Sequence, residues 1–249
     1  MTPDGTYQPL VSIMVKEESG LKLWCSFDQQ NTLAGTPKKR DPGVYRIWYR
    51  LSGNPNYEEL TDWNGPILAA IKAPLTVTVE SAAKIDDGEA LTAGIRYDAL
   101  LDGHRIGESR VTSITGPGEA EAKLLSLAIL DEEGTDVSFA YDLTVVTGRL
   151  VILTEPVFTL PALTGEIGEE AFAGIKAESV LLGEEVTRVG AKAFAGSTDL
   201  SALIVMGSDT AFDESALEDS DFVTVYAPAG SVAESFAEKA GIPFLPLVK

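Results

Sequence analysis

His104 and Cys25 are the only histidine and the only cysteine in the 249 residues, so they limit the chemistry available to the chain. A Ser-His-Asp triad would have to use His104, but the sequence has no Gly-x-Ser-x-Gly elbow to present a nucleophile. One histidine and one cysteine are also too few for a usual zinc site or an internal disulfide. We expect His104 to be a turn or strand-edge residue, Cys25 to be buried in a strand, and the chain not to be an enzyme.

The 38 acidic residues are a second possible source of chemistry. A glycosidase needs only two carboxylates, roughly 5 to 10 Å apart. The adjacent pairs at 169–170 and 184–185 and the run 131–133 lie in turn-like contexts, which favours a solvated surface. Residues 131–136 (DEEGTD) could offer oxygen ligands to calcium, but they lack the EF-hand spacing, so a hairpin loop is the simpler interpretation. We expect no cofactor and no metal.

A binding surface is a third possibility, and it depends on one strand. In residues 44–51 (VYRIWYRL) the side chains alternate, so Arg46, Trp48 and Arg50 share one face while Ile47 and its alternate neighbours form the expected core face. If the first face is exposed, it forms an aromatic and cationic ladder that Trp24 and Trp63 could join. Such patches bind sugars or proteins. The alternative is that these tryptophans belong to the core.

Charge and hydropathy restrict the partners. The chain has 19 basic and 38 acidic residues, a net charge of -19, and the excess of acidic residues lies after residue 73. Coulomb repulsion therefore argues against nucleic acid and anionic membrane surfaces as partners. No apolar run reaches the roughly 18 residues of a membrane span, so we expect no membrane insertion. The polar start at residues 1–4 (MTPD) is not a signal peptide, and we expect any export signal to lie outside this sequence.

Residues 1–73 consist of short β-type runs separated by turn residues, which is typical of a β-sandwich. The residues 4–7 (DGTY), 23–28 (LWCSFD) and 43–57 (GVYRIWYRLSGNPNY) occur in an order that resembles bacterial Ig-like modules of surface proteins. The resemblance implies a first Ig-like β-sandwich over 1–73.

Residues 74–155 repeat this theme. Residues 75–79 (LTVTV) alternate as a strand, and 87–92 (DGEALT), 103–104 (GH) and 148–150 (GRL) match points of a related Ig-like module. This second resemblance implies another Ig-like β-sandwich over 74–155. Pro156 and Pro161 then mark a joint, because closely spaced prolines disfavour both a helix and a central strand.

The last third contains an internal repeat. Residues 167–174 (IGEEAFAG) return 22 residues later as 189–196 (VGAKAFAG). A repeat of this length predicts stacked coils that bury Phe172 and Phe194 in one core, with parallel strands at 178–182, 202–205 and 222–226. Ser231 and Glu234 form a capping box and Gly241 a helix stop, so a capping helix is expected over 231–241.

This run closely resembles the BspA-type leucine-rich repeats of bacterial surface and secreted proteins, over about residues 160–247. The resemblance implies export, display at the cell surface, and binding of host proteins, glycans or neighbouring cells. Within the repeats, the variable positions 176–178 and 197–199 are the expected contact residues, above all Lys176, Glu178, Ser197 and Asp199.

The sequence thus predicts a mainly β, monomeric chain of two Ig-like β-sandwiches (1–73 and 74–155) and a leucine-rich solenoid (156–249) with a C-terminal capping helix. The expected function is non-enzymatic: a secreted or cell-surface segment that binds a host protein or a glycan. Two alternatives stay open, a structural stalk of a larger surface protein and an accessory region of a secreted polysaccharide-degrading enzyme.

Overall fold

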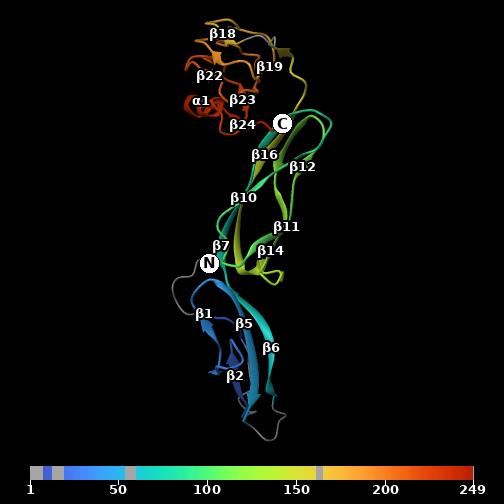
Figure 1. The fold of residues 1–249 in the computed structure, drawn as a ribbon, viewed down its shortest axis with the longest axis vertical. Coiled ribbons are helices and arrows are strands. Elements are labelled where there is room, and N and C mark those ends of the chain that lie inside the picture. Colours follow the sequence, from blue (N-terminus) through green and yellow to red (C-terminus); the bar gives the residue numbers. More distant parts are fainter. Residues whose placement is uncertain (1–7, 13–19, 54–59, 161–164, 249) are drawn as a thin grey trace. The chain divides into compact units, whose positions relative to one another are not determined.

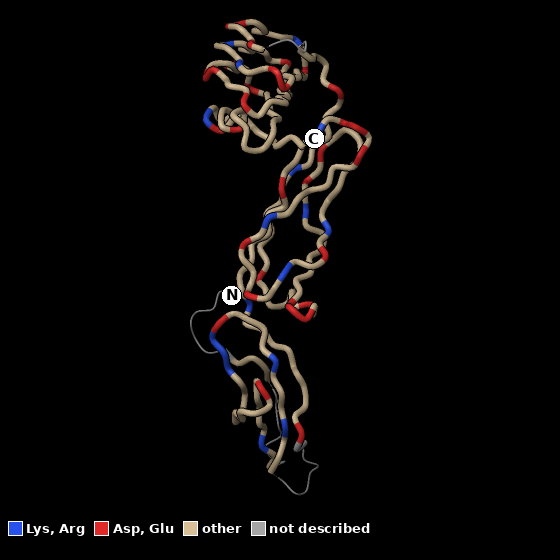
Figure 2. The backbone as a smooth tube through the Cα atoms, viewed as in Figure 1, with Lys and Arg blue, Asp and Glu red and all other residues tan. Residues whose placement is uncertain are grey.

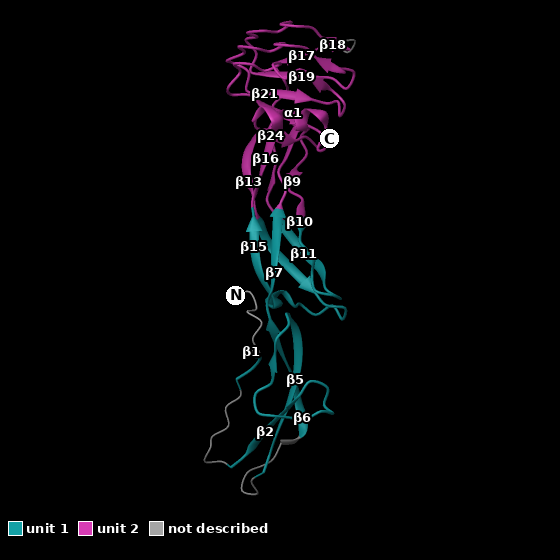
Figure 3. Ribbon diagram, turned by 90° about the vertical axis from the view of Figure 1, so that its left-hand side faces the viewer, with its two compact units in different colours: residues 1–78, 96–110, 124–146 teal, residues 79–95, 111–123, 147–249 magenta. Residues whose placement is uncertain are grey.

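The computed structural model describes residues 8–12, 20–53, 60–160 and 165–248, and the chain divides into two compact units. Unit 1 comprises residues 1–78, 96–110 and 124–146, and unit 2 comprises 79–95, 111–123 and 147–249 (Figure 3). The motif residues 4–7 and 54–57 lie outside the described residues. The predicted domain boundaries near residues 73 and 155 stay predictions.

The fold is mainly β, with several small sheets, and the described residues contain one α-helix (Figure 1). The strands up to residue 92 are β1 (Gln8–Pro9), β2 (Lys22–Ser26), β3 (Leu33–Ala34), β4 (Lys38–Lys39), β5 (Gly43–Ser52), β6 (Leu60–Ile71), β7 (Ala73–Val79), β8 (Ala82–Ile85) and β9 (Leu91–Thr92). The elements from 95 to 153 are β10 (Ile95–Tyr97), β11 (Arg105–Val111), β12 (Ser113–Ile114), β13 (Gly118–Ala122), β14 (Leu124–Leu130), the 3-10 turn η2 (Ser138–Ala140), β15 (Tyr141–Val146) and β16 (Gly148–Leu153).

The remaining elements form the C-terminal part of unit 2. They are β17 (Phe158–Thr159), β18 (Glu166–Ile167), β19 (Ser179–Leu182), β20 (Arg188–Val189), β21 (Ala202–Val205), β22 (Ala211–Phe212), β23 (Thr224–Ala227), α1 (Val232–Ala240) and β24 (Phe244–Pro246).

Unit 1 is built around the sheet β3-β2-β5-β6, in which β5 pairs antiparallel with both β2 and β6. One face of this sheet carries the core: Cys25, Ile47 and Ala69 are buried, and Tyr49 packs against them. The predicted core face of β5 is therefore confirmed at Ile47, and so is the burial of Cys25. Unit 1 also contains the sheets β10-β7-β15 and β11-β14.

Strand β7 shows the predicted alternation clearly. Leu75, Val77 and Val79 are at most 1% exposed, whereas the threonines between them are half-buried. Apolar side chains on every second residue thus provide one buried face, as expected for a strand packed on one side.

In unit 2, the sheets of the C-terminal part are parallel and step through the sequence at a nearly fixed interval. The five-stranded sheet runs β17-β19-β21-β23-β24, and a second sheet runs β18-β20-β22. Val180 on β19 pairs with Phe158 on β17, 22 residues earlier, and with Leu203 on β21, 23 residues later. Each step returns the chain to the same sheet after one coil, as the repeat in the sequence predicts.

The interior of these coils is apolar. Phe194 is fully buried and its ring stacks on that of Phe172 with 5.5 Å between centroids, and Phe172 itself is partly buried. Phe222 was expected to begin the third parallel strand, but it is 77% exposed and precedes β23, which starts at Thr224. Phe222 lies in the turn that leads into β23, so its side chain is not held against the apolar interior of the coil.

Helix α1 follows the last coil and is capped at both ends as predicted. The Ser231 hydroxyl accepts a hydrogen bond from the Glu234 backbone N–H, and the Glu234 carboxylate accepts one from the Gly230 N–H. Gly241 ends the helix with φ 67°, a left-handed conformation that glycine adopts without a steric penalty.

Candidate functional site

The three tryptophans of the chain gather on the face of the unit 1 sheet opposite its core. Trp48 lies on β5, and across the β2–β5 pairing Trp24 lies opposite Arg50. Residues directly opposite each other in an antiparallel pair share a face, so Trp24 lies on the same side as Trp48 and Arg50. Trp63 of β6 joins them through Arg50. We call these four residues, Trp24, Trp48, Arg50 and Trp63, the tryptophan face.

Arg50 is the centre of the tryptophan face. Its guanidinium carbon lies 4.8 Å from the ring centroid of Trp63, within the range of a cation–π interaction. Trp24 lies opposite Arg50 on the neighbouring strand β2, and its indole N–H donates a 3.0 Å hydrogen bond to the hydroxyl of Ser52. All four side chains are half-buried, so the face combines fixed ring positions with access to solvent. The structure therefore brings Trp48 and Arg50 together on one face, and Trp24 and Trp63, which the sequence analysis named as possible members, join them.

Arg46 shares this side of β5, but its charge is engaged elsewhere. Its Nη2 atom lies 2.5 Å from Oε2 of Glu133 and 3.4 Å from Oδ2 of Asp131. The Arg46 charge is thus shared with two carboxylates, and the prediction that Arg46 contacts a ligand stays a prediction. Sequence reasoning could not find these partners, which lie 85 and 87 residues further along the chain.

The loop that holds Asp131 is a tight turn. The Asp131 carboxylate accepts hydrogen bonds from the backbone N–H groups of Glu133 and Thr135. The bond from Thr135 is the largest cause that lowers the pKa of Asp131, with a smaller contribution from the Arg46 charge. The Asp131 carboxylate oxygens are thus engaged in hydrogen bonds within the turn and in the ion pair with Arg46. Within the described ranges, no group of three or more His, Cys, Asp or Glu side chains is placed to hold a metal ion.

His104 and Cys25 each have a structural role: His104 contacts a tyrosine hydroxyl, and Cys25 is buried in the core. His104 follows the turn before β11, and its Nδ1 lies 2.8 Å from the hydroxyl of Tyr141, which also accepts the Leu101 N–H. The turn-or-edge prediction for His104 is confirmed. The Cys25 thiol is buried, and desolvation raises its pKa, which keeps it in the less reactive thiol form.

The predicted contact residues of the repeats separate into two groups. Lys176, Glu178 and Asp199 are exposed, and the Lys176 Nζ lies 3.6 Å from Oδ2 of Asp199. Ser197, in contrast, is 1% exposed and its backbone N–H donates to the Ser220 hydroxyl at 3.1 Å. The prediction that Ser197 contacts a ligand is wrong, because its side chain faces the interior of the coil.

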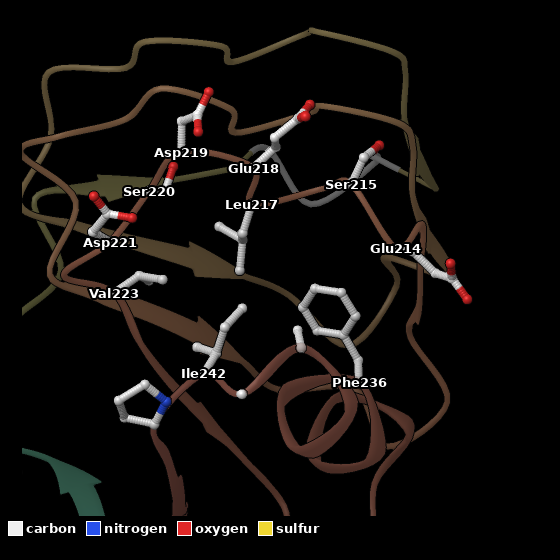
Figure 4. A pocket seen from close by; sticks show the side chains of 13 residues that line it. Glu214, Ser215, Leu217, Glu218, Asp219, Ser220, Asp221, Val223, Phe236 and Ile242 are labelled. Carbon is white, nitrogen blue, oxygen red and sulfur yellow. The ribbon is translucent and has the colours of Figure 1, made fainter.

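A hollow beside helix α1 was not anticipated from the sequence. It has a volume of about 550 Å³ and lies between the turn 213–220 and the segment 236–243 (Figure 4). Leu217 and Ile242 point toward each other across it, with the Phe236 ring beside them. Four carboxylates stand around its rim, those of Glu214, Glu218, Asp219 and Asp221. Their clustering was visible in the sequence as the run 213–221 (DESALEDSD), but nothing in it indicated a concave surface.

No helix among the described residues is long and apolar enough to cross a membrane. Comparison of the chain with protein-family models, curated proteins and solved structures finds no match, so its function has to be argued from the site itself.

Proposed function

We propose that the chain is a non-enzymatic, ligand-binding segment of an exported bacterial surface protein, and that the tryptophan face is its contact surface for a host glycan or protein. The observation that carries the proposal is the clustering of all three tryptophans of the chain around Arg50, on the side of the sheet away from the core. Half-buried aromatic rings held beside a cation are unusual on a surface that binds nothing.

The chemistry of the face suits both kinds of ligand. The faces of sugar rings present C–H groups that pack on indole rings, and the guanidinium of Arg50 donates hydrogen bonds to hydroxyl or carbonyl oxygens. Tryptophan and arginine are also the residues that most often carry the energy of protein–protein interfaces. Because Trp63 and Trp24 already flank Arg50, little side-chain entropy is lost when a ligand docks.

The proposal also includes an assignment of the three parts of the chain to known kinds of fold. We assign residues 1–73 and 74–155 to two Ig-like β-sandwiches and 156–249 to a leucine-rich solenoid. Support comes from the alternation in β7, from the core face of β5 at Ile47, from the steps of 22 and 23 residues between parallel strands, and from the buried Phe194.

An array of glycans and host proteins, probed with the whole chain, tests this function. We expect binding to one class of probe, and at least about tenfold weaker binding by the Trp48→Ala variant, because loss of a tryptophan that carries binding energy costs about 2 kcal/mol or more. Tyr97→Ala is the matched control, since Tyr97 is an aromatic residue of unit 1 on another sheet and is 46% exposed. Binding that survives in Trp48→Ala, with both variants folded by circular dichroism, would contradict the proposal.

A stalk is the second candidate, and one feature of unit 2 favours it. The C-terminal residues return to β8: Leu247 bridges to Ala83, and the Val248 N–H donates to the Ala83 carbonyl at 2.7 Å. Leu247 and Ala83 share a buried cluster with Ile204 and Tyr226 of the parallel sheet. Such a shared core connects β8 stiffly to the parallel sheet, and a stiff connection suits a spacer. Absence of binding to every probe on the array would favour this second function.

A further inference from the structure

The turns of the repeat coils are joined by a ladder of backbone hydrogen bonds that runs in one direction. The Phe172 N–H donates to the Ala193 carbonyl at 2.8 Å, and the Phe194 N–H donates to the Ala216 carbonyl at 2.8 Å. The glycines at 174 and 196 repeat this pattern, since each donates its N–H to the following coil at 2.8 Å. Each turn therefore directs its N–H groups toward the next coil.

The last turn has no further coil to receive its N–H groups. Leu217 occupies the place of Phe194 in the preceding coil, and Asp219 occupies the place of Gly196 with a positive φ of 56°. Over the part of the chain that the structure describes, the backbone N–H groups of Leu217 and Asp219 have no hydrogen-bond acceptor. Helix α1 takes the place of the next coil only in part, where Phe236 stacks on Phe212 at 4.7 Å. The hollow of Figure 4 is the space left over.

The charges around the hollow narrow the choice of ligand. Glu218 is ion-paired with Lys192 at 3.0 Å, and the Asp219 charge contributes less to the raised pKa of Lys192 than Glu218 does. Within the described ranges, no ion pair is formed by the carboxylates of Glu214, Asp219 and Asp221. Figure 2 shows how few basic residues lie near the acidic ones in these coils. N–H donors that face an open hollow can exchange water for a carbonyl acceptor of a ligand, whereas the carboxylates repel an anionic acceptor. A neutral peptide carbonyl on a positively charged chain satisfies both conditions.

We propose that this hollow binds a lysine- or arginine-containing peptide segment of a partner protein, which lies along residues 213–220 in the place of a further coil. Carbonyl groups of the peptide accept the N–H groups of Leu217 and Asp219, and its cationic side chains face the three carboxylates. The aliphatic part of a lysine or arginine side chain packs on Ile242, which is only partly buried. The site lies in unit 2 and is independent of the tryptophan face.

Fluorescence anisotropy with a labelled eight-residue Lys-Ala peptide tests the charge requirement. We expect saturable binding, no binding of a Glu-Ala peptide of equal length, and about tenfold weaker binding by the variant Glu214→Gln/Asp219→Asn/Asp221→Asn, as three exposed charge contacts together suggest. Asparagine tolerates the left-handed conformation at 219. The control variant Glu166→Gln/Glu169→Gln/Glu170→Gln removes equal charge from an exposed cluster in the first coil. Equal weakening in both variants, or no saturable binding, would overturn the proposal.

Amide hydrogen exchange tests the backbone contacts separately. We expect the N–H groups of Leu217 and Asp219 to exchange more slowly when the Lys-Ala peptide is bound, because they then donate to its carbonyl groups. Spermine carries positive charge but no carbonyl, so it should bind more weakly and should not protect these amides. Unchanged exchange with bound peptide, or equal protection by spermine, would contradict an added coil.

Discussion

Phe194 holds the interior of the repeat coils together. It is fully buried, stacks on Phe172 and lies beside Leu182 and Leu203, which are also fully buried. Each coil contributes too little apolar surface to fold alone, so a large side chain that contacts neighbouring coils stabilises several of them at once.

Phe194→Ala should therefore lower the opening free energy of the coils by about 3–5 kcal/mol, the range for removal of a buried phenylalanine. Hydrogen exchange measured by mass spectrometry over residues 179–205 gives the opening free energy of the coils themselves. Tryptophan fluorescence is not suitable, because all three tryptophans lie in unit 1. Phe222→Ala removes the same side chain from a position that is 77% exposed, and its effect should be below about 0.5 kcal/mol. Equal losses in the two variants would show that Phe194 is not a core residue.

Individual residues also show how far the sequence could be interpreted. Alternation in residues 44–51 was enough to assign the two faces of β5, because side-chain direction in a strand is a local property. The ion pair of Arg46 with Glu133 could not be foreseen, since it depends on a contact between residues 87 positions apart. Ser197 was misassigned for a related reason: only its burial and its bond to Ser220 reveal that it faces inward.

At the scale of elements, α1 is the one whose ends were fixed most precisely by sequence. Both ends use local signals: the Ser231 hydroxyl bonds to the Glu234 N–H, and Gly241 adopts a left-handed conformation. The three predicted parallel strands correspond to β19, β21 and β23, with edges that moved by at most two residues, but β17 and β24 of the same sheet were not predicted. The hollow beside α1 depends on how the helix packs against the last coil.

Ser231→Ala should destabilise α1 by about 1 kcal/mol, because it removes a capping hydrogen bond at a buried position. The measurement is the exchange rate of the amides in residues 232–240, which should rise several-fold. Ser235→Ala is the control, since Ser235 is an exposed position inside the helix where alanine is the better helix former. Equal or slower exchange in Ser231→Ala than in wild type would show that the cap does not hold the helix.

At the scale of the whole molecule, the two proposed sites differ in chemistry as well as in place. The tryptophan face in unit 1 combines aromatic rings with Arg50, while the hollow in unit 2 combines carboxylates with free backbone donors. The uneven distribution of the net charge of -19 was visible in the sequence. The return of Leu247 and Val248 to β8 was not, because pairing between residues 164 or more positions apart leaves no local pattern.

Binding of a ligand to the tryptophan face can be tested directly by fluorescence. The three tryptophans of the chain all lie on this face, so tryptophan emission, excited selectively over that of the seven tyrosines, reports on this face. The best glycan or protein fragment without tryptophan from the array is titrated into the whole chain, with calorimetry as an independent measure of binding. We predict a saturable change in tryptophan emission with the same Kd as the calorimetric titration, and its loss in Trp48→Ala. A saturating heat of binding with unchanged tryptophan emission would show that the ligand binds elsewhere on the chain.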